Sequence, residues 1–288
     1  MSIERALELQ QRSWSLQSDG KLEDAVLASR EALRLIEEAD PASPDVANLL
    51  NDLAEIEFDR RNLDAALALT ERAGSIEHAL GGLFAGEAAA RIRARTLSLA
   101  GLTRRARGDY ADAEIDLRRA LDISLAEFGE TSLEAAEARN NLAVVYKYSG
   151  RFGEGLALYS ASLPHIVAAH GAQSLETATL YHNIGGLLHA QGDFAGAEAP
   201  ARKAWEISRA LVGDDDPRAM ADAAAYAAVL DGLERYEEST GIYRRALAVF
   251  ERVFGPEHEE VGRPCTTWAP HWPRVAIARR QSVATAEP

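Results

Sequence analysis

The sequence predicts an all-α protein, an α-solenoid of six helix hairpins, and three observations support this class. A turn motif recurs at nearly constant spacing, small residues occupy fixed positions around it, and the composition suits long helices. Hydrophobic residues make up 47% of the chain but aromatic residues only 7%, so the apolar residues are mostly Ala, Leu and Val. Because a length of 288 residues fits one large domain, two domains or an extended array, the repeat decides between them.

The turn motif is Gly-x-aromatic, as in "GDY", "GRF" and "GDF", with the variants "GKL", "RNL" and "ERY". We call its last residue the anchor. Successive anchors lie 41, 47, 42, 42 and 42 residues apart. The one longer interval contains the Gly-rich residues 78–90, where we expect a loop insertion. The six anchors are Leu22, Leu63, Tyr110, Phe152, Phe194 and Tyr236.

Each repeat reads as one helix before the anchor and one helix after it. In the fourth repeat, apolar residues with helical spacing precede the anchor at Leu142, Val145 and Tyr146. The same spacing resumes after the anchor at Leu156 and Tyr159. This periodicity predicts a helix hairpin in every repeat.

Small residues mark where the two helices of a hairpin must cross closely. Counted from the anchor, positions −9, +3 and +10 hold only Ala, Gly or Ser in all six repeats, and we expect these columns to form the contact between paired helices. Column −9 is Ser13, Ala54, Gly101, Ala143, Gly185 and Ala227. Column +3 is Ala25, Ala66, Ala113, Gly155, Ala197 and Ser239, and column +10 is Ala32, Ala73, Ala120, Ser162, Ala204 and Ala246.

Local signals predict where helices begin and where they are disturbed. Helix starts are expected at Ser43 before Pro44, in the Thr131–Glu134 box, and at Asp216 before Pro217. Pro164 and Pro200 lie inside predicted second helices. A proline there removes a backbone donor and clashes with the preceding turn, so we expect a kink or local break near both.

Residues 4–261 resemble the tetratricopeptide repeat family, in the 42-residue form found in kinesin light chains and many bacterial proteins. The resemblance rests on the small-residue columns and on "ARNNLAVVYKYSGRF", "YHNIGGLLHAQGDFAGAE" and "RYEESTGIYRRALAVFERVFGPEHEEV". It implies a right-handed superhelix whose concave groove is lined by the first helix of each hairpin and binds peptide or protein segments. We therefore expect a repeat array over residues 1–261, with Arg12 departing from the family pattern because an apolar residue belongs there.

Residues 262–288 do not continue the repeat. A seventh anchor is due at position 278, yet the stretch "EVGRPCTTWAPHWPRVAIARR" at residues 260–280 contains no matching pattern. When this stretch is back-translated with GC-rich codons and the DNA is read in a neighbouring reading frame, it can encode "ALHNLGAALAARGD". That sequence would be a further repeat in register. We expect a frameshift and a disordered tail here, which would leave the last hairpin uncapped and prone to self-association. A natural capping extension is the alternative.

Charge and composition limit the partners and the compartment. The net charge of −14 argues against binding to nucleic acid or to an anionic membrane, since both require a cationic surface. The single Cys excludes an internal disulfide, and the chain shows neither a leader pattern nor an apolar stretch long enough to span a membrane. These features favour a cytoplasmic protein.

The predicted groove is lined by positions −15, −12, −11, −8, −5 and −4, which share one face of the first helix; we call them the first-helix stripe. Asparagines on it offer both donors and an acceptor to the backbone of an extended peptide, and Asn141 and Asn183 match the position at which the resemblance implies such contacts. Bonding of these amides to neighbouring helix ends or to water is the alternative. The candidate peptide-binding residues are Asn48, Asn51, Glu55, Arg95, Arg105, Glu137, Asn140, Asn141, Lys147, Tyr148, Thr179, His182, Asn183 and His189.

Charged stripe residues extend this prediction to the ligand. Arg95, Arg105 and Lys147 would suit carboxylates, whereas Glu55, Glu137 and Asp231 would suit cations. Trp14 and Trp205 have helical positions typical of the core.

No catalytic motif is present, and we expect no enzyme activity, cofactor or metal. His182 and His189 share a face but lack a third ligand. The acidic turn "GDDDP" at residues 213–217 is expected to join two repeats and to cap a helix. The sequence thus predicts a non-catalytic scaffold that binds a protein segment in its groove. A regulatory or sensor module severed from a larger signalling protein, or a self-associating array, is the alternative.

Overall fold

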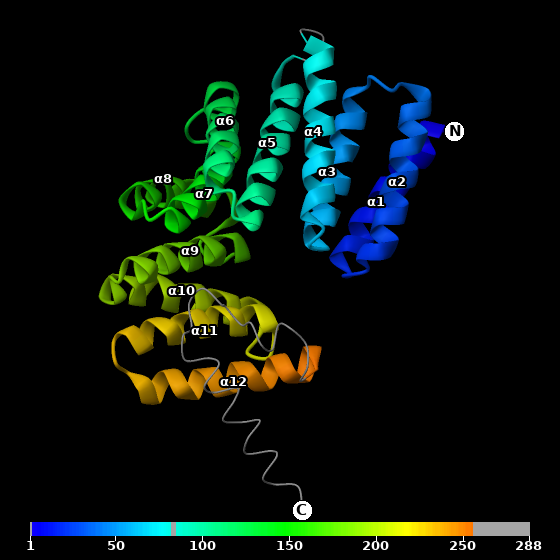
Figure 1. Cartoon of the computed structure of the whole chain (residues 1–288). Coiled ribbons are helices and arrows are strands. Elements are labelled where there is room, and N and C mark those ends of the chain that lie inside the picture. The colour runs from blue at the N-terminus through cyan, green and yellow to red at the C-terminus, as the bar shows by residue number, and fades with distance from the viewer. Residues whose placement is uncertain (1, 82–84, 256–288) are drawn as a thin grey trace, which may run out of the picture. The chain divides into compact units, whose positions relative to one another are not determined.

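The computed structural model describes residues 2–81 and 85–255, and these residues form twelve α-helices (Figure 1). The predicted frameshift and tail of residues 262–288 lie outside the described residues. The helices are α1 (Ser2–Ser18), α2 (Leu22–Ala39), α3 (Pro44–Asp59), α4 (Leu63–Leu80), α5 (Glu87–Arg107), α6 (Tyr110–Phe128), α7 (Leu133–Tyr148), α8 (Phe152–His170), α9 (Leu175–Gln191), α10 (Phe194–Val212), α11 (Pro217–Gly232) and α12 (Tyr236–Phe254).

The predicted all-α repeat solenoid is confirmed. Each of the six anchors is the first residue of an even-numbered helix, so the helices follow one another as six pairs. The chain divides into two compact units, residues 1–145 and 146–288, and each is described by itself below.

The turn inside each pair explains the glycine of the turn motif. The residue two positions before the anchor has a positive φ in every repeat, from 62° at Glu234 to 92° at Gly108. Glycine adopts this left-handed conformation without a steric penalty. Four repeats carry Gly at this position, whereas Arg61 and Glu234 adopt the same conformation in the other two.

The small-residue columns pack as the sequence predicts, since all eighteen residues are buried. In the first pair, the Ser13 hydroxyl on α1 donates to the carbonyl oxygen of Ala25 on α2 at 2.9 Å. In the third pair, a Cβ added at Gly101 would lie only 2.6 Å from Cγ of Leu117. The helices approach too closely at these points for larger side chains.

Caps and turns account for the helix boundaries. Ser43 and Asp216 accept hydrogen bonds from the backbone N–H groups of Asp45 and Arg218, as predicted. In the Thr131–Glu134 box the capping residue is Ser132, whose hydroxyl accepts from Ala135 N at 3.2 Å.

Two expectations about interruptions need correction. No break occurs at the prolines, because α8 continues through Pro164 and α10 through Pro200. The insertion in the third repeat also does more than lengthen a loop, because α5 has 21 residues whereas α3 has 16.

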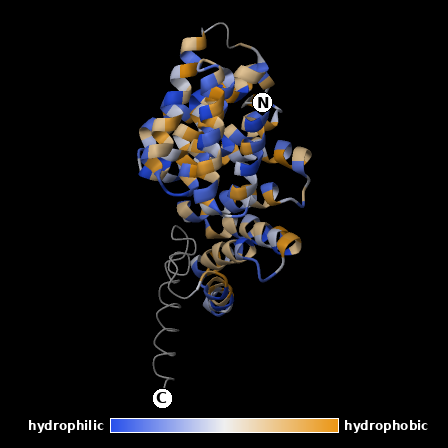
Figure 2. Cartoon of the chain, turned by 90° about the vertical axis from the view of Figure 1, so that its right-hand side faces the viewer, coloured by the Kyte–Doolittle hydropathy of each residue, from blue (hydrophilic) through white to orange (hydrophobic). Residues whose placement is uncertain are grey.

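Apolar residues alternate with polar ones along the helices of both units (Figure 2). Leu50, Ile56 and Leu117 are fully buried in residues 1–145, as are Tyr159 and Tyr243 in residues 146–288. Burial of these apolar faces supplies most of the favourable free energy of such helices.

The tryptophans differ from the prediction that both lie in the core. Trp14 is 46% exposed, because position −8 faces away from the partner helix. Trp205 is partly buried and stacks on Tyr226, with ring centroids 5.8 Å apart.

Candidate functional site

A polar network joins the first-helix stripes of the first three repeats. Gln10 Nε2 on α1 donates to Asp52 Oδ2 on α3 at 2.7 Å. On the other side, Arg95 Nη1 on α5 lies 2.7 Å from Asp52 Oδ1, and the side chain of Asp52 is only 2% exposed. One buried carboxylate thus connects three successive odd-numbered helices.

Arg95 makes further contacts on α3. Its guanidinium donates to Asn48 Oδ1 at 3.2 Å and to Glu55 Oε2 at 2.8 Å. Burial alone would lower the pKa of Arg95, but the Asp52 and Glu55 carboxylates raise it above its ordinary value. The predicted groove residues Asn48, Glu55 and Arg95 therefore lie together and already pair with one another.

Asn51, a predicted peptide-binding residue, is buried and not available at the surface. It is 0% exposed, and its Nδ2 donates to Thr96 Oγ1 on α5 at 2.8 Å. Thr96 in turn donates to Glu77 Oε1 on α4 at 2.5 Å, and burial raises the pKa of the Glu77 carboxyl. Asn51 thus holds neighbouring hairpins together, because position −12 turns partly toward the next repeat.

An apolar ribbon on α1 is the feature that sequence reasoning missed. Ile3, Leu7 and Trp14 are 54%, 53% and 46% exposed, and their spacing of four and seven residues keeps them on the stripe face. Leu7 and Trp14 occupy positions −15 and −8, so applying the stripe to the first repeat would have revealed them. Two residues of the ribbon, Ile3 and Leu7, line a small hollow of about 50 Å³ together with Asp45 and Asn48 of α3.

The remaining stripe residues of the first unit lie on α5 and α7. Arg105 is partly buried near the end of α5, and Glu137 is exposed on α7. Asn140 and Asn141 are partly buried, and Asn140 Nδ2 lies 3.5 Å from Asn141 Oδ1. These side chains are at least partly exposed, unlike Asn51.

The second unit repeats the contact that Asn51 makes. His182 on α9 occupies the same position −12, and its Nδ1 lies 2.7 Å from Asp222 Oδ1 on α11. Asp222 and Thr96 both occupy position −14 of the following repeat. One residue at −12 in each unit therefore bonds to −14 of the next hairpin, whereas Gln10 at −12 bonds to Asp52 at −11. On α9, Thr179 is exposed and Asn183 is partly buried.

His189 and Asp231 lie at position −5 of neighbouring repeats. Burial, aided by the positive charge of Lys147, lowers the pKa of His189 below its usual range, although the Ala228 carbonyl and Asp231 act in the opposite direction. The folded protein thus favours a neutral imidazole, whose ring packs edge-on to Phe194 at 5.3 Å between centroids. Lys147 also lies over the ring of Tyr148 at 5.6 Å, and Tyr148 is 38% exposed.

Asp231 does not offer the cation contact that was expected of it. It is 8% exposed and accepts hydrogen bonds from the hydroxyls of Ser239 and Tyr243 on α12. The carboxylate thus holds α11 to α12 in the last described hairpin.

The acidic turn before α11 has the structural role predicted for it. Asp214 pairs with Arg245 at 3.1 Å, and Asp215 with Arg252 at 3.5 Å, while Asp216 caps α11. Within the described residues, no three His, Cys, Asp or Glu side chains are grouped as a metal ion would require.

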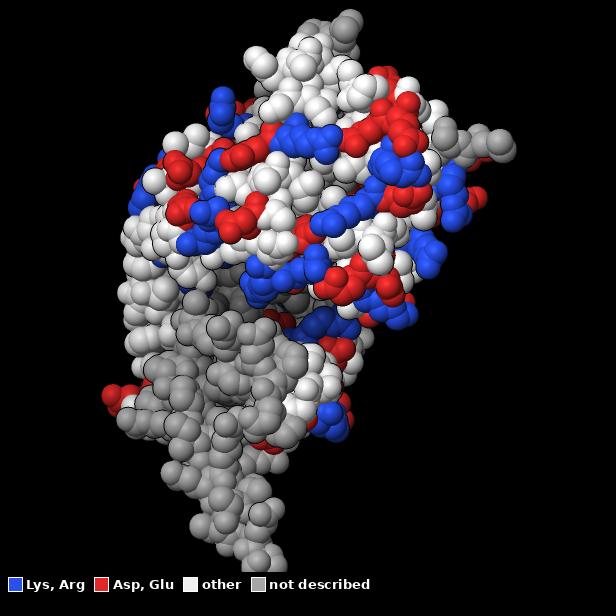
Figure 3. All heavy atoms as spheres, turned by 45° about the vertical axis from the view of Figure 1, so that its right-hand side comes forward, with Lys and Arg blue, Asp and Glu red and all other residues white. Residues whose placement is uncertain are grey.

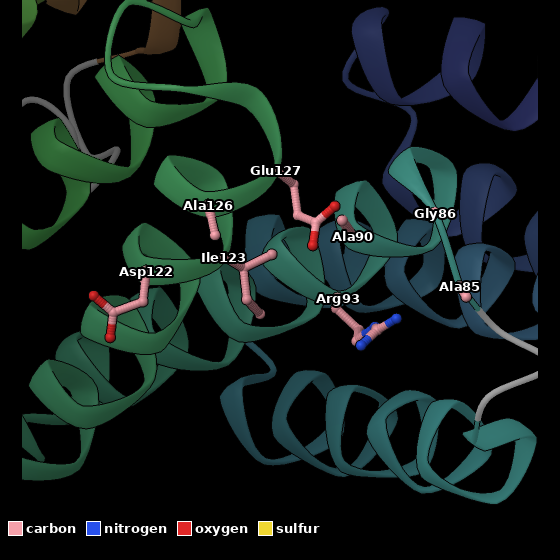
Figure 4. A pocket seen from close by; sticks show the side chains of 8 residues that line it. All are labelled: Ala85, Gly86, Ala90, Arg93, Asp122, Ile123, Ala126 and Glu127. Atoms are coloured by element: carbon pink, nitrogen blue, oxygen red, sulfur yellow. The ribbon is translucent and has the colours of Figure 1, made fainter.

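A cleft of about 390 Å³ lies between the start of α5 and the end of α6 (Figure 4). Figure 4 shows Asp122 and Arg93 on opposite sides of it, with Ile123 between the two helices. Its wall begins at Ala85 and Gly86, next to residues 82–84 outside the described range.

Surface charges of both signs are interspersed on the face that Figure 3 shows. Pairs such as Arg34 with Glu31 at 2.6 Å and Arg60 with Glu23 at 2.6 Å are typical, and exposed pairs of this kind add little stability. Among the described helices, none is both long and apolar enough to cross a lipid bilayer.

Comparison with curated proteins finds fungal relatives. The Clustered mitochondria protein homolog of Aspergillus clavatus is 26% identical over 173 residues, which are 60% of this chain and 13% of that protein. The homolog of Aspergillus oryzae is 24% identical over the same share of this chain and 14% of its own length. The chain thus spans about an eighth of the length of these relatives.

Solved structures share the fold. BtubC from P. vanneervenii has a TM-score of 0.66 at 22% identity, covering 81% of this chain and 92% of its own. A putative kinesin light chain of Podosopora anserina has a TM-score of 0.59 at 14% identity, covering 73% and 97%. Aspartyl phosphate phosphatase F of Bacillus subtilis has a TM-score of 0.66 at 15% identity, covering 88% and 62%.

The sequence model of the family described as Tetratricopeptide repeat matches residues 92–154 and 134–210. A second model with the same description matches residues 227–260. Together they span more than half of the chain. The chain belongs to the tetratricopeptide repeat family.

Proposed function

We propose that the chain is a non-catalytic scaffold that binds a segment of another protein along the first-helix stripe of residues 2–145. The observation that carries this proposal is the exposed ribbon of Ile3, Leu7 and Trp14 on α1, beside the polar network of Gln10, Asp52 and Arg95. A tetratricopeptide repeat fold is consistent with protein–protein interaction, and the exposed ribbon supports the first unit as the proposed location of the binding surface.

The stripe combines an aromatic anchor with a rigid support. Tryptophan and arginine contribute most often to the energetically dominant contacts of protein interfaces, and Trp14 and Arg95 both lie on this face. Since Arg95 is held by Asp52, Asn48 and Glu55, little of its freedom remains to be lost on binding. The partner segment would place an apolar side chain on the ribbon and backbone groups against the polar residues.

Asn141 and Asn183 remain the proposed contacts with a peptide backbone. Both are partly buried, but Asn141 belongs to the first unit and Asn183 to the second. Only Asn141 is therefore tested on the surface proposed for the first unit. We also propose a cytoplasmic location, which the single Cys supports.

A photoreactive amino acid in place of Trp14 tests the proposed surface. It should cross-link a partner that the same residue in place of Leu27 does not, since Leu27 is 66% exposed on α2 away from the stripe. With that partner purified, Trp14→Ala should weaken binding by about 2 kcal/mol, and Asn141→Ala by about 1 kcal/mol. Leu27→Ala should have no effect. Equal affinities of the Trp14 and Leu27 variants, measured by calorimetry, would refute the stripe as the binding surface.

A regulatory module of a larger signalling protein is the second candidate. It is favoured by one comparison, in which the matching segment makes up only 13% of the Aspergillus clavatus protein. Sequencing the source DNA from the codon of residue 255 onward tests it. If this second function is right, a corrected reading frame continues the repeats into a further domain. A DNA sequence that confirms the present reading frame and a stop codon after residue 288 contradicts it.

A further inference from the structure

A second cleft lies in residues 146–255, on three helices of the second unit. It measures about 520 Å³, and its apolar wall is formed by Leu163 of α8 with Ile184 and Leu188 of α9. Helix α10 supplies the opposite wall through Pro200 and Lys203. This volume is within the range of sites that accept a bulky side chain or a small ligand.

The cleft is separate from the first-helix stripe. On α9 the stripe consists of Thr179, His182, Asn183 and His189, whereas the cleft uses positions −10 and −6 of the same helix. At about 100° per residue, these positions lie on the opposite side of the helix. A ligand in the cleft therefore would not touch the surface proposed above.

Pro200, a proline found at this position only in the fifth repeat, lines the cleft. At position +6, three other repeats carry the larger Leu69, Leu158 and Ile242, and the remaining two carry Ala28 and Asp116. The Pro200 ring extends less far than the leucine and isoleucine side chains, and the neighbouring cleft residues Gly196 and Ala199 are small. Because α10 remains helical through Pro200, the missing volume becomes surface cleft.

The charges at the rim select the ligand. In the described part of the chain, no carboxylate lies within ion-pair distance of Lys203. Arg202, also at the rim, has only a loose contact with Glu206 at 3.8 Å. Two cations against one carboxylate give this rim a net positive charge in a chain whose net charge is −14. Such a rim attracts anionic groups that flank an apolar side chain.

We propose that this cleft docks an acidic segment of a partner protein, with one bulky apolar side chain inserted between α8, α9 and α10. The segment's carboxylates would pair with Lys203 and Arg202. The protein would then have two independent docking surfaces, one on each unit.

Fluorescence anisotropy with short labelled peptides tests this proposal on the full chain. Each probe has a central Leu, Phe or Trp between glutamates in a Gly-Ser background. Matched probes replace the apolar residue with Ser, or the glutamates with lysines. At least one acidic apolar probe should bind saturably, and its matched probes should bind about tenfold more weakly or not at all.

Two variants locate the binding. Pro200→Leu fills the cleft with the residue found at this position in other repeats, and it removes a proline from a helix interior, so the fold is preserved. It should weaken binding of the acidic probe by about tenfold or more, and so should Lys203→Glu. Ala210→Leu adds similar volume at an exposed position of the same helix, and this variant should bind like the parent chain.

Several outcomes would overturn the proposal. They are the absence of saturable binding by all three acidic probes, equal binding of the lysine probes, and unchanged affinity in Pro200→Leu. Concentration-dependent mass in light scattering that Pro200→Leu abolishes would instead assign the cleft to a second copy of this chain. Weaker binding of the acidic probe to Trp14→Ala would place the probe on the first-helix stripe and would also overturn the proposal. The stripe itself is tested separately, with its purified partner.

Discussion

Replacing Tyr243 with alanine is expected to lower the free energy of unfolding by about 3–5 kcal/mol. Tyr243 on α12 is 1% exposed, and its hydroxyl donates to Asp231 Oδ2 on α11 at 3.2 Å. The substitution leaves a cavity between the two helices and removes one of the donors to a buried carboxylate. Urea unfolding followed by circular dichroism measures the loss.

Two matched variants separate the effect of the cavity from the effect of the lost hydroxyl. Tyr243→Phe keeps the ring and removes the hydroxyl, so it should cost about 1 kcal/mol. Tyr236→Ala changes the same residue type at the first residue of α12, where the side chain is 53% exposed, and should cost less than about 1 kcal/mol. If the two alanine variants were equally stable, Tyr243 would not be the packing centre of this hairpin.

The position of this hairpin's core could be predicted from the sequence, because it depends on local periodicity. The turn spacing identified the first residue of all six even-numbered helices, and all three small-residue columns are buried. Every repeat faces the same packing problem between its own two helices. A residue type that recurs at one position therefore reports directly on that contact.

Contacts between successive repeats could not be predicted in the same way. Whether position −12 faces a ligand or the next hairpin depends on how adjacent pairs are rotated, and the repeat period does not contain that angle. Asn51 was expected to be accessible but donates to Thr96, and His182 lies beside Asp222. Both pairs need a polar residue at −14 of the next repeat, which is a relation between two repeats rather than a pattern within one.

The burial of Glu57 in the core is a second feature that the repeat pattern does not predict. It occupies position −6, where four of the other five repeats have apolar residues such as Leu188 and Leu230, yet it is 0% exposed. Arg30 at 3.1 Å and Arg60 at 2.7 Å compensate its charge from two neighbouring segments. Burial of a charge is tolerated when such partners are present, and only the folded structure brings these partners together.

Removal of the Asp52 carboxylate should have the second-largest effect, because it affects both stability and the proposed binding surface. We expect Asp52→Ala to lower the free energy of unfolding by roughly 2–3 kcal/mol, the value typical of hydrogen bonds to a buried charged group. Gln10 on α1 would lose its acceptor, and Arg95 on α5 would keep only Glu55 and Asn48. Since α1 carries Trp14, affinity for the stripe's partner should fall as well.

Asp59→Ala is the matched control on the same helix. Asp59 accepts from Gln17 at 2.8 Å, in a pair that is also 42 residues apart but exposed. Water replaces that bond readily, so the variant should change stability by less than about 0.5 kcal/mol. Equal stability of the two variants in urea would mean that the buried network does not hold α1 against α3. A loss confined to Asp52→Ala, accompanied by weaker partner binding, would mean that the hydrogen bonds which fix the repeats also present Trp14 to the partner.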